Sequence, residues 1–445
     1  MVLTLRVPFA VTQSISKSPN PESEIQMRRN FLLVTLCILS CLPVSRAGDW
    51  PQFMGPQHDR KSEGVIPVAW SSTQPRKVWE FAVAGGFSSF VTGGGRAYTV
   101  IAHEGRETAI AVDRATGRRL WQTAFGPAKY RNGGDQGTDA NSGGDGPRAT
   151  PVFAANRVFV FGGGFDLHAL DSATGKVLWS RDLMRDFGGS ELVWSNAQSP
   201  LVLGDQVLVA GGGKGQAYLA FGAADGKVRW KRGDDLPTHA TPIPVTLHGK
   251  RQVLFMVQRG VVSLDPADGS ELWHYPFPYR TATAASPVVW QDIVNCSAAY
   301  GVGGGACKVT RSGEKWDVEE LWRSPGDKDT AAHWSTAVVQ DGYMYGCYGR
   351  GRESHGTGPF KCIDIRTGEI KWAQPGFGPS QVILVGKRIV ATTDAGRLVV
   401  IDPSPDGYRE LAASKVLDGK VWSTAAFSAG QLLVRSTKQA VCLEF

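Results

Sequence analysis

The sequence predicts an all-β protein, an eight-bladed β-propeller of four-stranded antiparallel blades, from three observations. A turn containing Asp and Gly and followed by tryptophan recurs along the chain, most clearly at residues 111–121 and 169–179. Short runs of alternating apolar residues flank these turns, as expected for strands. The outer-strand pattern at 77–81 has no strand before it, and the strand pattern at 440–445 has none after it. We therefore expect residues 77–445 to form a ring whose terminal strands share one blade, which leaves no exposed sheet edge.

Each recurring turn has a local physical basis. Asp bonds its own backbone and Gly takes a positive φ, so the pair forms a tight hairpin turn between two strands. A tryptophan four residues later can fill the wedge between neighbouring sheets, and its N–H can reach a backbone acceptor. With Leu411, these tryptophans mark eight units of about 50 residues, a period typical of propeller blades. We interpret them as structural residues, and in chain order they are Trp79, Trp121, Trp179, Trp230, Trp273, Trp322 and Trp372.

Two further strands complete each unit. The first begins with small residues, which suit strands that crowd a central axis, and the second follows it as an alternating apolar run. Small-residue starts occur at 149–151, 198–200, 240–242, 285–287, 335–337 and 423–425, and examples of the second strand occur at 157–161, 206–210, 388–391 and 431–435. With the two strands around each turn, the sequence predicts four strands per blade.

Composition limits the class of protein. The chain has 445 residues, of which 42% are hydrophobic and 20% are charged, so a wholly disordered chain and a polytopic membrane protein are both excluded. The formal net charge is +7, and it falls to +4 without residues 1–47, which carry five basic and two acidic residues. Such mild and scattered charge does not favour nucleic-acid binding. We expect a monomer.

The N-terminal 47 residues are typical of an export signal. Arg28 and Arg29 precede the apolar run 31–42, and small residues follow up to Ala47. The run is too short for a membrane span, which needs about 20 residues. Met27 is an alternative start, and Cys41 lies in a sequence that resembles a lipoprotein cleavage box. We therefore expect export to the periplasm or cell envelope, either as a soluble protein or anchored through Cys41, with residues 48–76 as an N-terminal extension.

Five cysteines follow the expected leader. In an oxidising compartment Cys296 and Cys307 could form a disulfide across adjacent strands, and so could Cys347 and Cys362. One thiol, such as Cys442, would then stay free. The alternative is that all five are small buried core residues.

The turn frame AxDxxTGKxxW at residues 169–179 resembles the pyrroloquinoline quinone (PQQ) repeat family. That family includes eight-bladed quinoprotein dehydrogenases and the BamB-type outer-membrane assembly lipoproteins. The segments 49–56, 146–151, 186–189 and 407–411 are similar to those of exported bacterial PQQ-like propellers. The resemblance implies the fold, whereas chemistry has to be argued from a site, because one fold supports many functions.

The long insertions all lie on the propeller face that leads into the inner strands, so we expect function on this loop-rich face. Arginine can form paired hydrogen bonds to a carboxylate and tryptophan can stack on a ring, so the residues there suit a planar or anionic ligand. The alternative is that they plug the channel and bond one another. The candidates at the channel mouth are Arg148, Trp194, Asn196, His239, His333, Trp334 and Trp422.

One insertion is a candidate metal loop. Asp135, Asp139 and Asp145 lie among glycines, and such oxygen ligands on a flexible loop could hold calcium. The spacing matches no EF-hand, and the alternative is a solvated polar loop.

Two functions follow from the resemblance. The first is a non-catalytic binding or scaffold module of the cell envelope, with a protein, a polymer or a small ligand on the loop-rich face. The second is a PQQ-dependent quinoprotein alcohol dehydrogenase, in which calcium would polarise the quinone and an Asp would act as the base. That class commonly has adjacent cysteines at the quinone, and this chain has none. We expect the first function.

Overall fold

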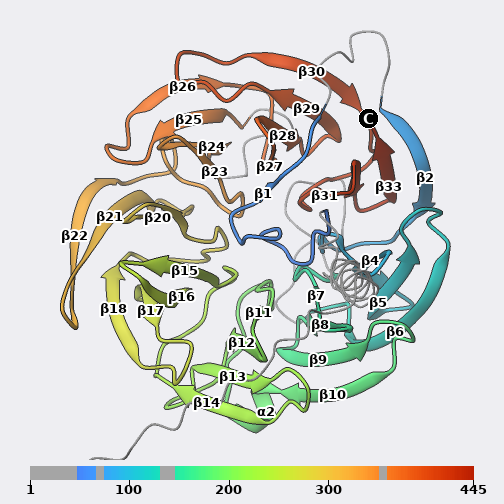
Figure 1. The fold of residues 1–445 in the computed structure, drawn as a ribbon, viewed down its shortest axis with the longest axis horizontal. Coiled ribbons are helices and arrows are strands. Elements are labelled where there is room, and N and C mark those ends of the chain that lie inside the picture. The colour runs from blue at the N-terminus through green and yellow to red at the C-terminus, as the bar shows by residue number, and fades with distance from the viewer. Residues whose placement is uncertain (1–47, 67–74, 131–145, 350–357) are drawn as a thin grey trace, which may run out of the picture. The chain divides into compact units, whose positions relative to one another are not determined.

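The structure, a computed structural model, describes residues 48–66, 75–130, 146–349 and 358–445. Within these ranges, eight sheets form a ring around a common centre (Figure 1). Seven sheets have four strands and one has five. The predicted eight-bladed propeller is therefore confirmed. The one helix in the described ranges is α2 (Leu183–Phe187), which connects blades 2 and 3.

The strands follow the chain from the centre of each blade outward. Blade 1 contains β3 (Val91–Gly93), β4 (Arg96–His103), β5 (Arg106–Asp113) and β6 (Arg119–Pro127); blade 2 contains β7 (Val152–Ala154), β8 (Arg157–Phe161), β9 (Asp166–Asp171) and β10 (Val177–Asp182). Blade 3 contains β11 (Leu201–Leu203), β12 (Gln206–Ala210), β13 (Tyr218–Gly222) and β14 (Val228–Arg232); blade 4 contains β15 (Ile243–Leu247), β16 (Lys250–Val257), β17 (Gly260–Leu264) and β18 (Glu271–Pro276). Blade 5 contains β19 (Val288–Trp290), β20 (Ile293–Ala298), β21 (Gly303–Ser312) and β22 (Lys315–Ser324); blade 6 contains β23 (Val338–Gln340), β24 (Tyr343–Cys347), β25 (Phe360–Asp364) and β26 (Ile370–Gln374). Blade 7 contains β27 (Gln381–Val385), β28 (Arg388–Thr392), β29 (Arg397–Ile401) and β30 (Glu410–Lys415), with β1 (Lys61–Ser62) at its inner edge; blade 8 contains β31 (Ala426–Ser428), β32 (Gln431–Arg435), β33 (Gln439–Glu444) and β2 (Arg76–Ala82).

Blade 8 closes the ring in the way that the sequence predicts. Its outermost strand β2 comes from the N-terminal part of the propeller and pairs antiparallel with β33 at the C-terminus. Because β2 and β33 pair with each other, closure of the ring depends on both ends of the chain.

The recurring tryptophans connect each blade to the next. The indole N–H of Trp121 donates to Ser172 O at 3.0 Å, and that of Trp179 donates to Ala223 O at 3.1 Å, in each case at the turn of the following blade. The glycine of that turn lies against the ring: a Cβ on Gly175, where φ is +73°, would be 2.6 Å from the Trp121 side chain. Glycine is thus required both for the turn conformation and for the close approach of the ring. Trp273 differs, because its N–H donates to Gln252 within its own blade.

Replacing Trp230 by phenylalanine tests this connection. Its indole N–H donates to Pro266 O at 2.9 Å, and phenylalanine keeps a ring but loses the donor. We expect the free energy of unfolding to fall by about 1 kcal/mol, measured by urea denaturation. Trp316→Phe is the matched control, because its indole N–H makes no hydrogen bond within the described ranges, and an equal loss in both variants would contradict the role of the bond.

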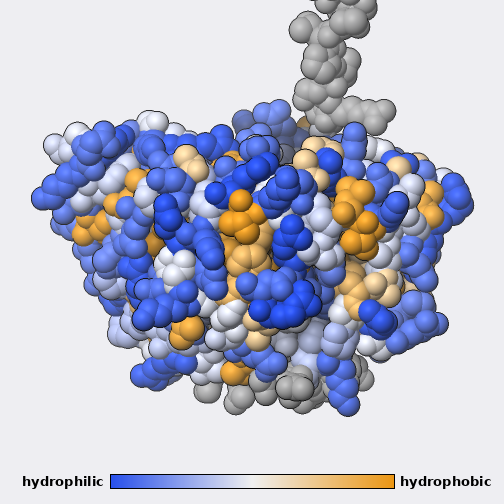
Figure 2. All heavy atoms as spheres, turned by 90° about the horizontal axis from the view of Figure 1, so that it is seen from below, coloured by the Kyte–Doolittle hydropathy of each residue, from blue (hydrophilic) through white to orange (hydrophobic). Residues whose placement is uncertain are grey.

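Apolar side chains fill the space between adjacent blades. Between blades 2 and 3, Phe159, Leu167, Val209 and Phe221 are fully buried in one cluster. Each such side chain stabilises the fold by about 1.5–3 kcal/mol. The outer wall seen in Figure 2 is mostly polar, with apolar side chains in separate patches. No helix among the described residues is long and apolar enough to cross a membrane.

The small residues at the strand starts form a belt of hydrogen bonds around the channel. The Ser89 N–H donates to Thr150 Oγ1 at 3.0 Å, and the Thr150 N–H donates to Ser199 Oγ at 2.9 Å. The Ser199 N–H donates to Thr241 Oγ1 at 3.0 Å, and the Thr424 N–H donates to Ser89 Oγ at 2.8 Å. Hydroxyl residues suit these positions because their oxygens accept backbone N–H groups across the junctions of blades 8 and 1, 1 and 2, 2 and 3, and 3 and 4.

The N-terminal segment, residues 48–66, crosses the centre of the ring, where Figure 1 shows it in blue. Trp50 and Thr92 exchange two hydrogen bonds of 2.8 Å, and the Phe153 N–H donates to Pro51 O at 2.8 Å. Further along, β1 pairs in parallel with β27. The segment therefore joins blades 1 and 2 to blade 7.

The Arg60 side chain extends from this segment into the channel. Its guanidinium donates to Thr336 O at 2.7 Å, to Gln381 Oε1 at 3.1 Å and to Thr424 Oγ1 at 2.9 Å, so it bonds blades 6, 7 and 8 at once. The side chain is fully buried, and this burial lowers its pKa to about 9. The guanidinium is still charged at neutral pH.

The five cysteines lie in the core of the propeller. All five are buried, and each is a free thiol. In the register of blade 5, Cys296 lies opposite Gly305 and Cys307 lies opposite Val294, so the two thiols are diagonal neighbours. Cys347 and Cys362 are offset in the same way in blade 6. Diagonal neighbours have Cα atoms about 7–8 Å apart, beyond the usual reach of a disulfide.

Candidate functional site

Aromatic residues converge at the mouth of the channel, where the loops lead into the inner strands. Trp194 stacks on Tyr300, with ring centroids 6.0 Å apart, and Tyr300 packs edge-on against His333 at 4.9 Å. His333 contacts Trp334 at 4.1 Å. These side chains come from three separate loops, so the fold brings together residues that are up to 140 positions apart.

The row continues across the mouth to the first and last blades. Trp334 contacts Trp422 at 4.4 Å, and Trp422 contacts Phe87 at 4.7 Å. The Lys420 ammonium lies 4.7 Å from the ring centroid of Trp422, within cation–π distance. The mouth cluster, as we name it, consists of Phe87, Trp194, Tyr300, His333, Trp334 and Trp422, all of them partly exposed.

The backbone at one end of the mouth cluster is strained. Trp194, Ser195 and Tyr300 have φ values of 66°, 61° and 63°, in the left-handed region that favours glycine. This conformation costs about 1–2 kcal/mol for each L-residue. Strain of this kind is concentrated at functional sites. Two of these residues, Trp194 and Tyr300, carry rings that stack on each other.

The other sequence candidates take different positions. Asn196 is fully buried, and its amide donates to Gln198 O at 3.1 Å and to two carbonyls of the β8 turn. His239 is also buried, and its Nε2 lies 2.8 Å from Val193 O. Burial lowers the pKa of His239 to about 4, so it is neutral at physiological pH. Both residues brace the loop that presents Trp194, whereas Arg148 lies over the Tyr130 ring at 5.0 Å.

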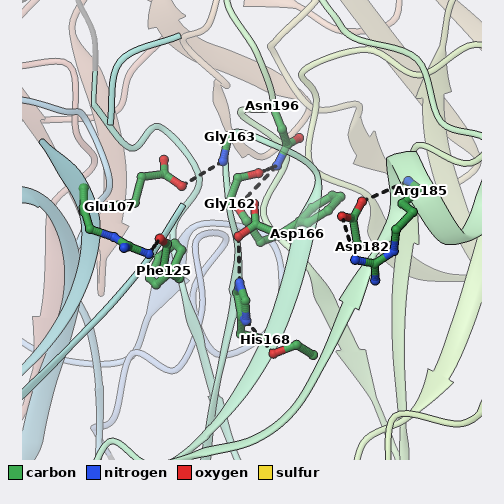
Figure 3. Close-up of polar contacts among 12 residues, drawn as sticks. Glu107, Phe125, Gly162, Gly163, Asp166, His168, Asp182, Arg185 and Asn196 are labelled. Atoms are coloured by element: carbon green, nitrogen blue, oxygen red, sulfur yellow. Dashed lines mark hydrogen bonds and ion pairs between the residues drawn. The ribbon is translucent and has the colours of Figure 1, made fainter. Parts of the chain in front are cut away.

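Two carboxyl groups, the buried Glu107 and the partly exposed Asp166, lie between blades 1 and 2, and the sequence analysis missed them. Glu107 Oε1 accepts a hydrogen bond from the Tyr130 hydroxyl. Its Oε2 accepts one from the Gly163 N–H at 2.9 Å (Figure 3). A Cβ on Gly162 would lie 2.4 Å from Asp166 Oδ1 and 2.8 Å from Glu107 Oε2, so both carboxyl groups converge on this glycine turn. The sequence feature that could have indicated this site is Glu107, an acidic residue near the start of a largely apolar strand.

The electrostatics of the pair distinguish its two members. Burial raises the pKa of Glu107 to about 7, against the opposing effect of the Tyr130 hydrogen bond, and Asp166 raises it further. Asp166 Oδ2 is 2.7 Å from His168 Nε2, whose other nitrogen is 2.7 Å from Ser180 Oγ (Figure 3). Glu107 therefore exchanges its proton near neutral pH. Because the carboxyl is buried, it acts on stability rather than on a ligand in solution.

Neighbouring rings of the row leave no room for a quinone between them. A planar ring between two aromatic faces needs roughly 7 Å between them, whereas neighbouring rings in the row from Tyr300 to Phe87 are 4.1–4.9 Å apart. Over the described ranges, no group of three His, Cys, Asp or Glu side chains is arranged to hold a metal ion. Asp135, Asp139 and Asp145 lie outside the described residues.

Comparisons with known proteins agree with the fold. The quinohemoprotein alcohol dehydrogenase from Comamonas testosteroni is similar, with a TM-score of 0.63 and 14% identity, over 89% of this chain and 80% of that one. Its counterpart from Pseudomonas putida HK5 has a TM-score of 0.64 and 13% identity, over 90% and 80% of the two chains. BamB from Moraxella catarrhalis has a TM-score of 0.57 and 13% identity, over 84% and 98%. At such identities the likeness concerns the fold alone.

The sequence comparison identifies the family. No curated protein sequence matches the chain at a significant level. The family model described as outer membrane protein assembly factor BamB matches residues 105–374, which is more than half of the chain. The chain therefore belongs to the family of PQQ-like propellers that this BamB model describes.

Proposed function

We propose that this chain is a non-catalytic binding or scaffold propeller of the cell envelope, which takes its partner at the mouth cluster. In this proposal residues 1–47 direct export, cleavage or lipid attachment at Cys41 follows, and residues 77–445 are the propeller. The observation that carries the proposal is the continuous aromatic row from Phe87 to Trp194. Partly exposed Trp and Tyr side chains with nearby cations are the usual anchors of protein interfaces.

The polar groups of the mouth support binding rather than chemistry. Asn196 and His239, the polar candidates with the most defined contacts, bond backbone carbonyls of the loop that presents Trp194. The indole N–H groups of Trp334 and Trp422 are buried at the mouth and have no hydrogen-bond acceptor in the described part of the chain. A quinone has no room between neighbouring rings of the row, and the dehydrogenase alternative draws its support from the fold.

Replacing Trp194 by alanine tests the proposal. Trp194 is at the end of the row, so its removal leaves the contacts of Trp334 and Trp422 in place. We expect binding of an envelope partner to weaken about 30-fold, the effect of losing an aromatic anchor of about 2 kcal/mol. The measurement is quantitative cross-linking of the purified chain in an envelope extract, with Trp316→Ala on the outer wall as the matched control.

Two results would contradict the proposal. One is equal cross-linking of the same partner by wild type and Trp194→Ala at unchanged melting temperature. The other is saturable micromolar binding of PQQ in the presence of calcium, followed by absorbance and calorimetry, together with dye reduction by short alcohols. The second result would revive the dehydrogenase alternative.

A further inference from the structure

A groove lies at the other end of the channel from the mouth cluster. The inner strands β15, β19 and β23 begin at the mouth and end beside residues of the N-terminal segment. This segment crosses the centre of the ring (Figure 1). Between that segment and the three strands the cavity measures about 510 Å³. Binding sites for small molecules span about 300–1,000 Å³. The groove therefore has the size of a ligand site and is separate from the aromatic mouth.

The charges of the groove favour an anion. Lys61 and Arg251 line it from opposite sides, one on the N-terminal segment and one on blade 4. Neither side chain forms an ion pair with any described residue. Asp59 also lines the groove, but its Oδ1 accepts the backbone N–H of Lys61 at 3.1 Å. Two cations and one carboxylate give the groove one net positive charge, which a monoanion would neutralise.

His58 adds a directed neutral donor. Its Nε2 is 2.8 Å from the amide nitrogen of Gln52, which also donates to Gly55 O at 2.9 Å. An amide nitrogen can only donate, so His58 Nε2 is the acceptor and the proton is on Nδ1. Burial, with a smaller effect of Arg251, lowers the pKa of His58 to about 4, which agrees with a neutral ring. With φ at 60°, the backbone of His58 is in the left-handed region.

The walls of the groove are apolar side chains and backbone of the inner strands. Val245, Val288 and Val289 are partly exposed there, above the buried side chains of Met54 and Ile243. A ligand with an apolar group next to its anionic group would thus cover the valines while the charge faces Arg251 and Lys61. An inorganic anion would leave these walls uncovered.

We propose that this groove binds a carboxylate attached to a small apolar group, with Arg251, Lys61 and the Nδ1–H of His58 around the carboxylate and Val245 and Val288 against the apolar part. Two sources share this chemistry. One is a free short-chain organic acid. The other is the C-terminal carboxylate of an apolar peptide, which could also pair with the open edge of an inner strand as β1 pairs with β27.

Isothermal titration of the purified chain tests the proposal with four probes. These are 4-methylpentanoate, N-acetyl-Val-Val with a free carboxylate, and the amide of each. We expect at least one acid to bind and its amide to bind at least about tenfold more weakly, because the amide lacks the charge. Tight binding of the acid alone identifies the organic-acid source, and tighter binding of the peptide identifies the C-terminal source.

Variants assign the binding to this groove. Arg251→Gln and Lys61→Gln should each weaken binding of the acid about tenfold or more, whereas Arg118→Gln, an exposed cation on a turn of blade 1, should have no effect. Both groove cations are at the surface, so the melting temperature should not change. Three results would overturn the proposal. They are equal affinity of the wild-type chain for an acid and its amide, equal affinity of wild type and Arg251→Gln for the acid, and no heat with any probe at millimolar concentration and 10-fold molar excess.

Discussion

Arg60→Met should lower the free energy of unfolding by about 3 kcal/mol or more, the largest effect expected of any single substitution described for this chain. Methionine fills similar space but has no donors. The substitution leaves Thr336 O, Gln381 Oε1 and Thr424 Oγ1 without the guanidinium that joins blades 6, 7 and 8. Each buried acceptor left without a partner costs about 1–3 kcal/mol. Urea denaturation followed by circular dichroism measures the loss.

Arg60→Lys separates geometry from charge. Lysine keeps the positive charge, but its single ammonium cannot reach acceptors on three blades as the planar guanidinium does. We therefore expect lysine to recover less than half of the loss. Arg118→Met on the surface is the control and should change stability by less than about 0.5 kcal/mol. If Arg60→Lys had the same free energy of unfolding as wild type, the positive charge alone would account for the stabilisation by Arg60.

Local patterns predicted the blades because the information is local. The Asp, Gly and Trp of each turn lie within eleven residues, and the turn type, the glycine φ and the ring position all follow from that spacing. The pattern does not specify which carbonyl accepts the indole N–H: Trp179 donates to Ala223 O, 44 positions away in the next blade. Closure by β2 and β33 was predictable because both ends of the chain lacked a strand.

Long-range contacts explain what the sequence did not predict. Arg60 bonds residues 276, 321 and 364 positions away, and nothing near it in the sequence marks it as buried. The mouth residues could be placed on one face by topology, but the contact between Trp334 and Trp422 depends on side-chain packing. Strand register decides whether two cysteines lie directly opposite each other or diagonally, because a register shift of two residues converts one arrangement into the other.

Glu107→Gln should remove a pH dependence of stability that the wild-type protein shows between about pH 5 and 8. Burial raises the pKa of Glu107 from its usual 4.5 to about 7 in the folded chain. In this window the folded protein holds a proton that the unfolded chain has released, so unfolding releases a proton and stability falls as pH rises. The shift corresponds to roughly 3 kcal/mol between the two ends of the window.

Glutamine is neutral at every pH and can still accept the Gly163 N–H, so the variant should be more stable than wild type at pH 8 and similar at pH 5. Asp205→Asn, an exposed carboxyl on the turn before β12, is the matched control and should leave the wild-type slope unchanged. The free energy of unfolding is measured at half-unit steps of pH in both variants. A wild-type curve that is flat from pH 5 to 8, or a Glu107→Gln curve with the same slope as wild type, would show that another group controls this range. Glu107 bonds Gly163 of the next blade, so the cost of ionising this buried carboxyl at high pH weakens the contact between blades 1 and 2.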